Sequence, residues 1–135
     1  MREMIGKSVL CFLLCQAVVT QAVITQAQVG SQVGAGSAHS LFIKPDGSLW
    51  AMGGNYSGQI GDGTTTQTNT PEMIVSSNVV LVAAGSSCSF FLDSTSNLWG
   101  MGDSSHGQLG LGATPSAVVP VKIATDVTSA GCADY

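Results

Sequence analysis

Charged residues are scarce in this 135-residue sequence: 9% are Asp, Glu, Lys or Arg, and only four of these are cations. Four cations cannot neutralise a run of phosphates, so nucleic-acid binding through the backbone is disfavoured. The chain also lacks the composition of a charged disordered tail, because 44% of it is hydrophobic. Its 17 glycines disfavour long helices, since each glycine inside a helix costs about 0.5–1 kcal/mol relative to alanine. The remaining class is an all-β protein of one small domain.

Metal and cofactor motifs are missing as well. No Cys-x-x-Cys or Cys/His spacing of the zinc type occurs, so neither a metal nor a cofactor is expected. Cys11 and Cys15 lie near the N-terminus, which leaves Cys88 and Cys132 in the remainder. These two permit one intramolecular pair, and the sequence leaves open whether they meet. We predict that both are small buried residues.

The first 27 residues differ from the rest and predict a secretory signal. Arg2 and Lys7 give a short basic start, followed by an apolar block over residues 8–19 that falls short of the ~20 apolar residues of a membrane-spanning helix. Cleavage is predicted after Ala27, with Ala22 as the other candidate, and a retained anchor helix is the alternative. The mature chain, 28–135, is then expected to be secreted or held in the cell envelope.

An internal repeat sets the architecture. Shifting the chain by 49 residues places 33–64 on 82–113 without a gap, so we assign a first unit to 33–81 and a second to 82–127. A truncated third unit occupies 128–135. Twelve repeated residues are predicted to be structural: Gly36, Trp50, Gly53, Gly58, Gln59, Gly61, Gly85, Trp99, Gly102, Gly107, Gln108 and Gly110.

Each unit has the pattern of short strands joined by tight turns. In the first unit, residues 40–43 and 49–52 predict a hairpin around Pro45-Asp46-Gly47. The second unit has residues 94–97 in place of that turn, and we predict the left-handed conformation at Asn97. The continuous apolar run 79–83 predicts a strand covered on both faces.

These motifs closely resemble the regulator of chromosome condensation repeat. The matching segments are 36–41, 47–53 and 57–64 in the first unit, and 98–102 and 106–112 in the second. The resemblance implies a β-propeller, whose complete form has seven four-stranded blades. This chain is therefore expected to hold two blades and the start of a third. Two blades leave open flanks, which indicates either a fragment of a longer propeller protein or self-association of several chains.

Several residues invite a catalytic or ligand-binding reading. Trp50 and Trp99 could stack a ligand around a channel, but one tryptophan per blade is more typical of a core anchor. His39 is expected to be a structural hydrogen-bonding residue, because Cys88 takes its place in the second unit. Ser40, His39 and Asp46 lack the Gly-x-Ser-x-Gly context of a hydrolase. No catalytic residue is therefore assigned, and the protein is not expected to be an enzyme.

Two further signals are weak. A calcium site at Asp62 would need six to eight oxygen ligands, and Leu111 replaces this residue in the second unit. Asn55-Tyr56-Ser57 is formally a glycosylation sequon.

The leading hypothesis is an exported, non-enzymatic module that presents propeller loops, such as residues 64–70, to a protein partner. The resemblance also implies two narrower roles: inhibition of a β-lactamase by capping its active site, and guanine-nucleotide exchange on a small GTPase. The remaining alternative is an inactive fragment of a longer propeller protein.

Overall fold

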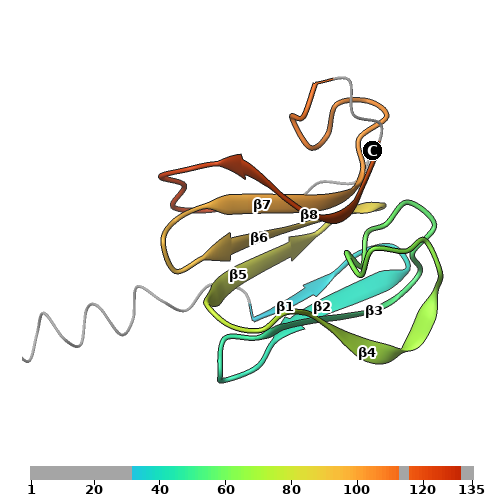
Figure 1. The fold of residues 1–135 in the computed structure, drawn as a ribbon, viewed down its shortest axis with the longest axis horizontal. Helices are drawn as coiled ribbons and strands as arrows, with labels where there is room; N and C mark the ends of the chain where they lie inside the picture. Colours follow the sequence, from blue (N-terminus) through green and yellow to red (C-terminus); the bar gives the residue numbers. More distant parts are fainter. Residues whose placement is uncertain (1–31, 113–115, 132–135) are drawn as a thin grey trace, which may run out of the picture.

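The computed structural model describes residues 32–112 and 116–131, which form two four-stranded antiparallel sheets (Figure 1). The segment 1–27, with its predicted cleavage at Ala27, and Cys132 lie outside the described residues. The first sheet has the order β1-β2-β3-β4, and its strands are β1 (Val33–Ala35), β2 (His39–Ile43), β3 (Leu49–Gly53) and β4 (Thr68–Val75). The second has the order β5-β6-β7-β8, and its strands are β5 (Val79–Ala84), β6 (Cys88–Asp93), β7 (Leu98–Asp103) and β8 (Ser116–Ala124).

The predicted all-β class is confirmed, and the described residues contain no helix. The two sheets also repeat their pairing in detail. β2 and β3 pair Phe42 with Trp50, and β6 and β7 pair Phe91 with Trp99. The pairing of β3 with β4 and that of β7 with β8 contain bulges at equivalent places. The 49-residue repeat in sequence is therefore a repeat of whole sheets.

The prediction of a left-handed residue at Asn97 is wrong. Ser96 has the positive φ, 62°, at the position equivalent to Gly47, whose φ is 79°. Asn97 instead donates its side-chain amide to Asp93 Oδ2 at 2.9 Å. Asparagine tolerates positive φ. The turn nevertheless places its positive φ at Ser96, one residue earlier, because this is the position equivalent to Gly47.

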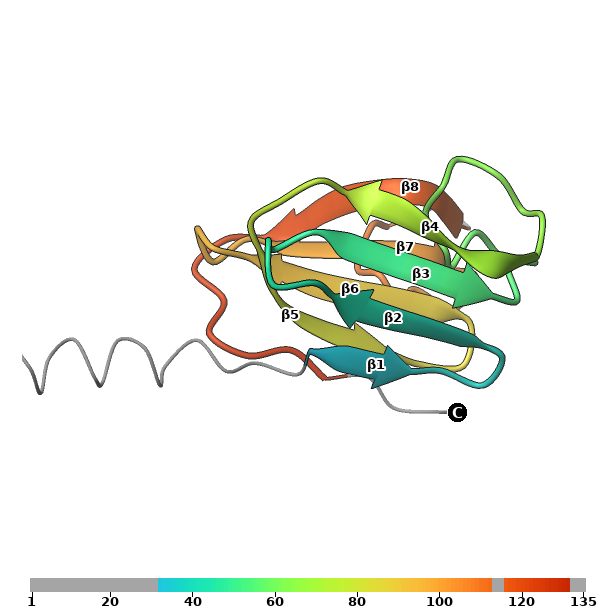
Figure 2. The ribbon, with the colours of Figure 1, turned by 90° about the horizontal axis from the view of Figure 1, so that it is seen from below.

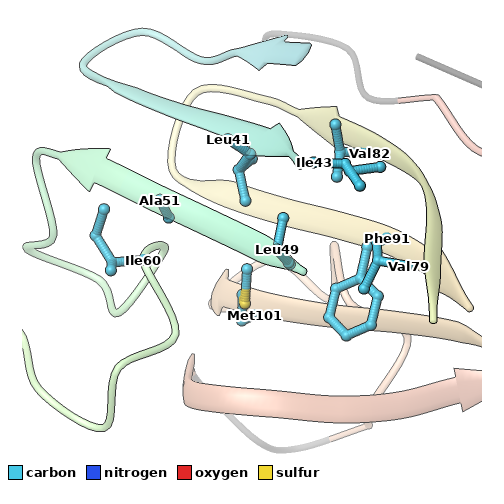
Figure 3. Packing of buried hydrophobic residues seen from close by; sticks show 9 residues of the cluster. All are labelled: Leu41, Ile43, Leu49, Ala51, Ile60, Val79, Val82, Phe91 and Met101. Atoms are coloured by element: carbon cyan, nitrogen blue, oxygen red, sulfur yellow. The ribbon is translucent and has the colours of Figure 1, made fainter. Parts of the chain in front are cut away.

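The two sheets pack face to face. Their first strands, β1 and β5, lie side by side, whereas their last strands, β4 and β8, lie at the opposite edge (Figure 2). Alternate residues of β2 are buried, as expected for a strand with one face in the core. The core between the sheets is shown in Figure 3 and comprises Leu41, Ile43, Leu49, Ala51, Ile60, Val79, Val82, Phe91 and Met101. Burial of each large side chain contributes about 1.5–3 kcal/mol to folding.

The run 79–83 predicted a strand covered on both faces, and β5 occupies it. Val79 and Val82 are buried, whereas the other residues of β5 are half-buried. β5 begins at Val79, three residues before residue 82, where the second repeat unit was predicted to start. The boundary between the sheets therefore differs from the boundary between the sequence repeats.

The chain leaves the second sheet in the way that it leaves the first. Asn78 has a φ of 70° and Asp126 a φ of 58°. The next residue in each case donates its backbone N–H to the hairpin turn: Val79 to Gly47 O and Val127 to Ser96 O, both at 3.0 Å. The exits from the two sheets are therefore alike as far as Val127.

Candidate protein-binding surface

Four connections gather at one end of the two sheets, and we call this end the loop end. They are the short turns 36–38 and 85–87 and the long loops 54–67 and 104–115, of which residues 113–115 lie outside the described part. The opposite end, the turn end, carries the tight hairpins 44–48 and 94–97. Six of the predicted repeat glycines shape the loop end with positive φ, and these are Gly53, Gly58, Gly61, Gly102, Gly107 and Gly110.

Asn55 organises the first long loop from inside. Its side chain is fully buried, and its Nδ2 donates to Asp62 Oδ1 at 3.1 Å and to the backbone oxygens of Thr64 and Thr66 at 3.1 and 3.2 Å. Its Oδ1 accepts the N–H of Ile60 at 2.9 Å. Every polar atom of the amide is therefore used within the loop. In the folded chain the side-chain amide of Asn55 is therefore inaccessible.

The second long loop repeats this plan with a shorter side chain. Ser104 stands in place of Asn55, and its Oγ accepts the N–H of Leu109 at 3.3 Å. The repeated glutamines have one shared role: Gln59 Oε1 accepts the N–H of Ser57, and Gln108 Oε1 accepts the N–H of His106, each at 2.9 Å. The predicted repeat residues of the loops thus hold their own turns.

The first loop is also fastened to the second sheet. His39 Nε2 lies 2.8 Å from Ser89 Oγ, and that hydroxyl donates to Gln59 O at 2.7 Å. Because the hydroxyl proton is committed to Gln59, His39 donates through Nε2–H, which leaves its buried Nδ1 without a hydrogen bond. Burial lowers the pKa of His39, so the ring is neutral. His39 is a structural residue, as the sequence predicted, and its partner lies in the other sheet.

Close backbone approach explains one more of the repeat glycines, Gly36. A Cβ on Gly36 would lie within 2.4 Å of both His39 Cε1 and the backbone oxygen of Gly85. Gly85 donates its N–H to Cys88 O at 2.9 Å, as Gly36 does to His39 O. The two short turns therefore meet at the loop end, and there is no room for a side chain between them.

The groups that the loop end presents to solvent are mostly hydroxyls and amides. Tyr56 is 77% exposed, and its hydroxyl lies 3.3 Å from Gln67 Oε1. Threonines continue this surface along the loop and into β4, and the exposed ones are Thr64, Thr65, Thr66 and Thr70. The segment 64–70, expected to be a partner-binding loop, is exposed except for half-buried Thr68.

Two carboxylates give the loop end a negative charge. Burial disfavours ionisation of Asp62, but hydrogen bonds from Thr64 and Asn55 outweigh it and lower the pKa of this carboxyl. The pKa of Asp103 is lowered by hydrogen bonds from Ser105, against a smaller effect of burial. Within 32–112 and 116–131, the two cations lie elsewhere, Lys44 over Trp50 and Lys122 beside Asn97 at the turn end.

The tryptophans do not belong to the loop end. Trp50 stacks on Phe42 with a centroid separation of 6.5 Å, and Trp99 stacks on Phe91 at 6.0 Å. Their Nε1 atoms donate to different groups of the hairpin turns: Trp50 to Ser48 Oγ at 2.8 Å, and Trp99 to Asp93 Oδ2 at 2.9 Å. Both rings are half-buried side chains that brace a hairpin, which favours the anchoring role over a ligand-stacking ring.

Hydrolytic chemistry finds no support in the placement of its candidate residues. His39 begins β2, whereas Asp46 lies beyond its other end and accepts hydrogen bonds from Ser48. His39 contacts Ser89 rather than Ser40. Among the described residues no group of three His, Cys, Asp or Glu side chains could hold a metal ion, and no helix is long and apolar enough to cross a membrane. Cys88 is buried.

Sequence comparison identifies the repeat. The sequence model described as the regulator of chromosome condensation (RCC1) repeat matches residues 46–92, and a second model of this repeat matches 31–59 and 79–108. Together the matches run from 31 to 108, more than half of the chain. Human protein RCC2 is 40% identical over 52 residues, which are 37% of this chain and 10% of RCC2.

Solved structures share the fold. Human WBSCR16 aligns with a TM-score of 0.64 and 28% identity over 70% of this chain and 25% of its own. Prp20p from Saccharomyces cerevisiae, described with its binding properties to Gsp1p and histones, aligns at 0.67 and 22% identity over 76% and 28%. Yeast RCC1 (Prp20) bound to Kap60 aligns at 0.62 and 19% over 79% and 29%. The predicted propeller-type architecture is confirmed, and the chain spans about a quarter of these structures.

Proposed function

The chain belongs to the RCC1 repeat family, and from this premise we propose that it is an exported, non-enzymatic module that binds a protein partner through its loop end. The observation that carries the proposal is the pairing of a locked loop with an exposed aromatic side chain. Asn55 holds the loop from within, while Tyr56, the next residue, is 77% exposed. A large side chain on a rigid loop binds a partner at little cost in conformational entropy.

The chemistry of the loop end indicates what the partner must offer. Hydroxyl and amide groups around Tyr56 favour a partner rich in hydrogen-bonding groups. Asp62 and Asp103 have lowered pKa values and neither Lys44 nor Lys122 lies beside them, so we propose that the partner presents basic side chains there.

The comparisons support a protein as the kind of partner. Prp20p is described with binding to Gsp1p and histones, and yeast RCC1 was crystallised with Kap60. Protein binding is thus a property of proteins that share this fold.

Export is the part of the proposal that rests on the N-terminal segment. The apolar block over residues 8–19 and the following Ala27 support cleavage and release to the envelope or the medium. Mass spectrometry of the secreted protein tests this, because cleavage after Ala27 leaves Gln28 as the first residue. A protein recovered with Met1 in the cell interior would contradict export.

A capture experiment tests the binding role. The purified chain is used as bait for proteins of the envelope and medium fractions, in parallel with the variant Tyr56→Ala and the control Tyr56→Phe. The proposal expects a specific protein that wild type and Tyr56→Phe retain and Tyr56→Ala loses by at least tenfold. Recovery that is equal for all three baits, or no specific protein, would contradict it.

Guanine-nucleotide exchange is the second candidate, supported by the family and by the likeness to Prp20p in fold. The described loops contain no long insertion that could enter a nucleotide site. A nucleotide-release assay with a small GTPase decides between the two, because accelerated release would replace the binding role by exchange. An inactive fragment is the third reading, and it expects failure in both assays.

A further inference from the structure

A row of four apolar side chains crosses the face of the first sheet that points away from the second. We call it the outer row; it consists of Val33, Phe42, Trp50 and Met73, which are paired in register across β1, β2, β3 and β4. Val33 is 63% exposed and Met73 is 55% exposed. Along β2, Phe42 alternates with Leu41 and Ile43, which lie in the core between the sheets, so the outer row points the other way.

The second sheet has the same row, and there its first two members are covered. Val82, Phe91, Trp99 and Lys122 are paired in the same register across β5 to β8. Val82 and Phe91 are each only 2% exposed, because Leu41 and Leu49 of the first sheet lie in one core with them. The position that is 2% exposed at Val82 is thus 63% exposed at Val33. Within the chain, Val82 and Phe91 are thus covered by the face of the first sheet that carries Leu41 and Leu49.

The second sheet has an equivalent of that face on the side that points away from the first sheet, and we call it the far face. Leu41 and Leu49 are fully buried against the second sheet, whereas their equivalents Phe90 and Leu98 remain half-exposed. Phe90 belongs to a smaller apolar cluster on the second sheet, with Leu109 and Ile123. The described residues therefore carry both halves of the contact between the sheets a second time: the outer row on the first sheet, and the face with Phe90 and Leu98 on the second.

The glycine loops repeat this difference. A Cβ on Gly58 would lie 2.7 Å from the Cα of Val118 in the neighbouring sheet. The equivalent residue, Gly107, has nothing within 4 Å of its Cβ position. The second sheet is thus shaped to receive a neighbour that the first sheet already has.

We infer that the outer row is a docking site for a second copy of this chain, whose Phe90 and Leu98 face takes the place that Leu41 and Leu49 take on Val82. The contact joins two different faces, so copies associate head to tail rather than about a twofold axis. Lys44 lies 3.4 Å from the Trp50 ring centroid and flanks the row at the turn end, where Lys122 lies near Trp99. Gly107 of the second copy then takes the place that Gly58 takes beside Val118, so this part of the loop end belongs to the contact.

Sedimentation equilibrium of the full chain tests this inference with two blocking variants. Val33→Glu places a carboxylate on the outer row, and Phe90→Glu places one on the far face, with Leu98→Lys as a second far-face variant. Ser94→Glu, an exposed change in the turn 94–97, is the matched control. Circular dichroism verifies that each variant keeps its strands.

We expect the mass of wild type and Ser94→Glu to rise with concentration above that of one chain. Each blocking variant should remain at the mass of one chain, because one of its two faces is closed. An equimolar mixture of Val33→Glu and Phe90→Glu should reach the mass of two chains, since each retains the face that the other lacks. Wild type that stays at the mass of one chain, or a mixture that fails to pair, would overturn the inference.

Discussion

His39 of the first sheet and Ser89 of the second are joined by a hydrogen bond of 2.8 Å that crosses the core boundary between the sheets. The Ser89 hydroxyl in turn donates a hydrogen bond to Gln59 O in the first long loop. One buried side chain thus connects the sheet contact with the loop end. Changes at this position should affect stability and loop order together.

Removal of the His39 ring should destabilise the protein. His39→Ala leaves Ser89 without its donor and opens a space beside Gly36, and we expect a loss of about 1–3 kcal/mol in the free energy of unfolding. His106→Ala is the control, because His106 is exposed at the loop end. Urea unfolding of the three proteins measures the difference. Equal stability of His39→Ala and wild type would contradict the role of this bond.

Stability should also fall in mild acid through His39. Burial lowers the pKa of this residue below its ordinary value of 6.5, so the unfolded chain takes up the proton first. The contribution is complete above pH 6.5 and is lost as the pH falls from 6.5 toward the lowered pKa of the folded protein. Thermal midpoints of wild type and His39→Gln between pH 7.5 and 5 check this. A parallel decline in both proteins would contradict it.

Asp93 should stabilise the second hairpin as long as it is ionised. Burial disfavours its charge, but hydrogen bonds from Asn97, Trp99 and Thr95 outweigh burial and hold the pKa of Asp93 well below 3.8. This stability is present above pH 3.8 and is lost as the pH falls through the lowered pKa. Asp93→Asn should therefore have a lower thermal midpoint than wild type at pH 7, and the gap should narrow in strong acid. A difference in thermal midpoint that stays constant with pH would contradict the role of the charge on Asp93.

The buried amide of Asn55 gives a prediction for the loop itself. Asn55→Ala leaves the N–H of buried Ile60 without its acceptor, and we expect a cost of about 1–3 kcal/mol and faster proteolysis within 54–67. Ser104→Ala is the matched change in the second loop, where the corresponding bond is longer, at 3.3 Å. Its effect should be smaller. Limited proteolysis followed by mass spectrometry locates the cleavage.

Much of the fold was predictable because the same 49-residue pattern occurs twice. The hairpin around residues 45–47, the strand over 79–83 and the structural role of His39 followed from residue types and their recurrence. Asn97 shows the limit of local preference: the repeat register, which places Ser96 on Gly47, would have located the positive φ.

Contacts between the sheets were not predictable in the same way. Ser89 as the partner of His39 depends on how two sheets are placed, and strand patterns do not contain that information. The same holds for Val33 and Val82, which occupy equivalent positions of the repeat but differ in exposure, because the first sheet covers Val82 and none of the described strands covers Val33. For Asn55, the signal in the sequence was a sequon, whereas its buried hydrogen bonds became visible only in the folded loop.

The two sheets are successive blades, and the first packs against the second through its long loop. Gly58 and Gly107 test this contact most directly, because they are equivalent, have φ values of 83° and 81°, and differ only in what lies beside them. Alanine at either position brings the same backbone strain, about 1–2 kcal/mol. Urea unfolding of Gly58→Ala and Gly107→Ala should show a larger loss for Gly58→Ala, whose Cβ meets the backbone of Val118. Equal losses would contradict the contact between the blades.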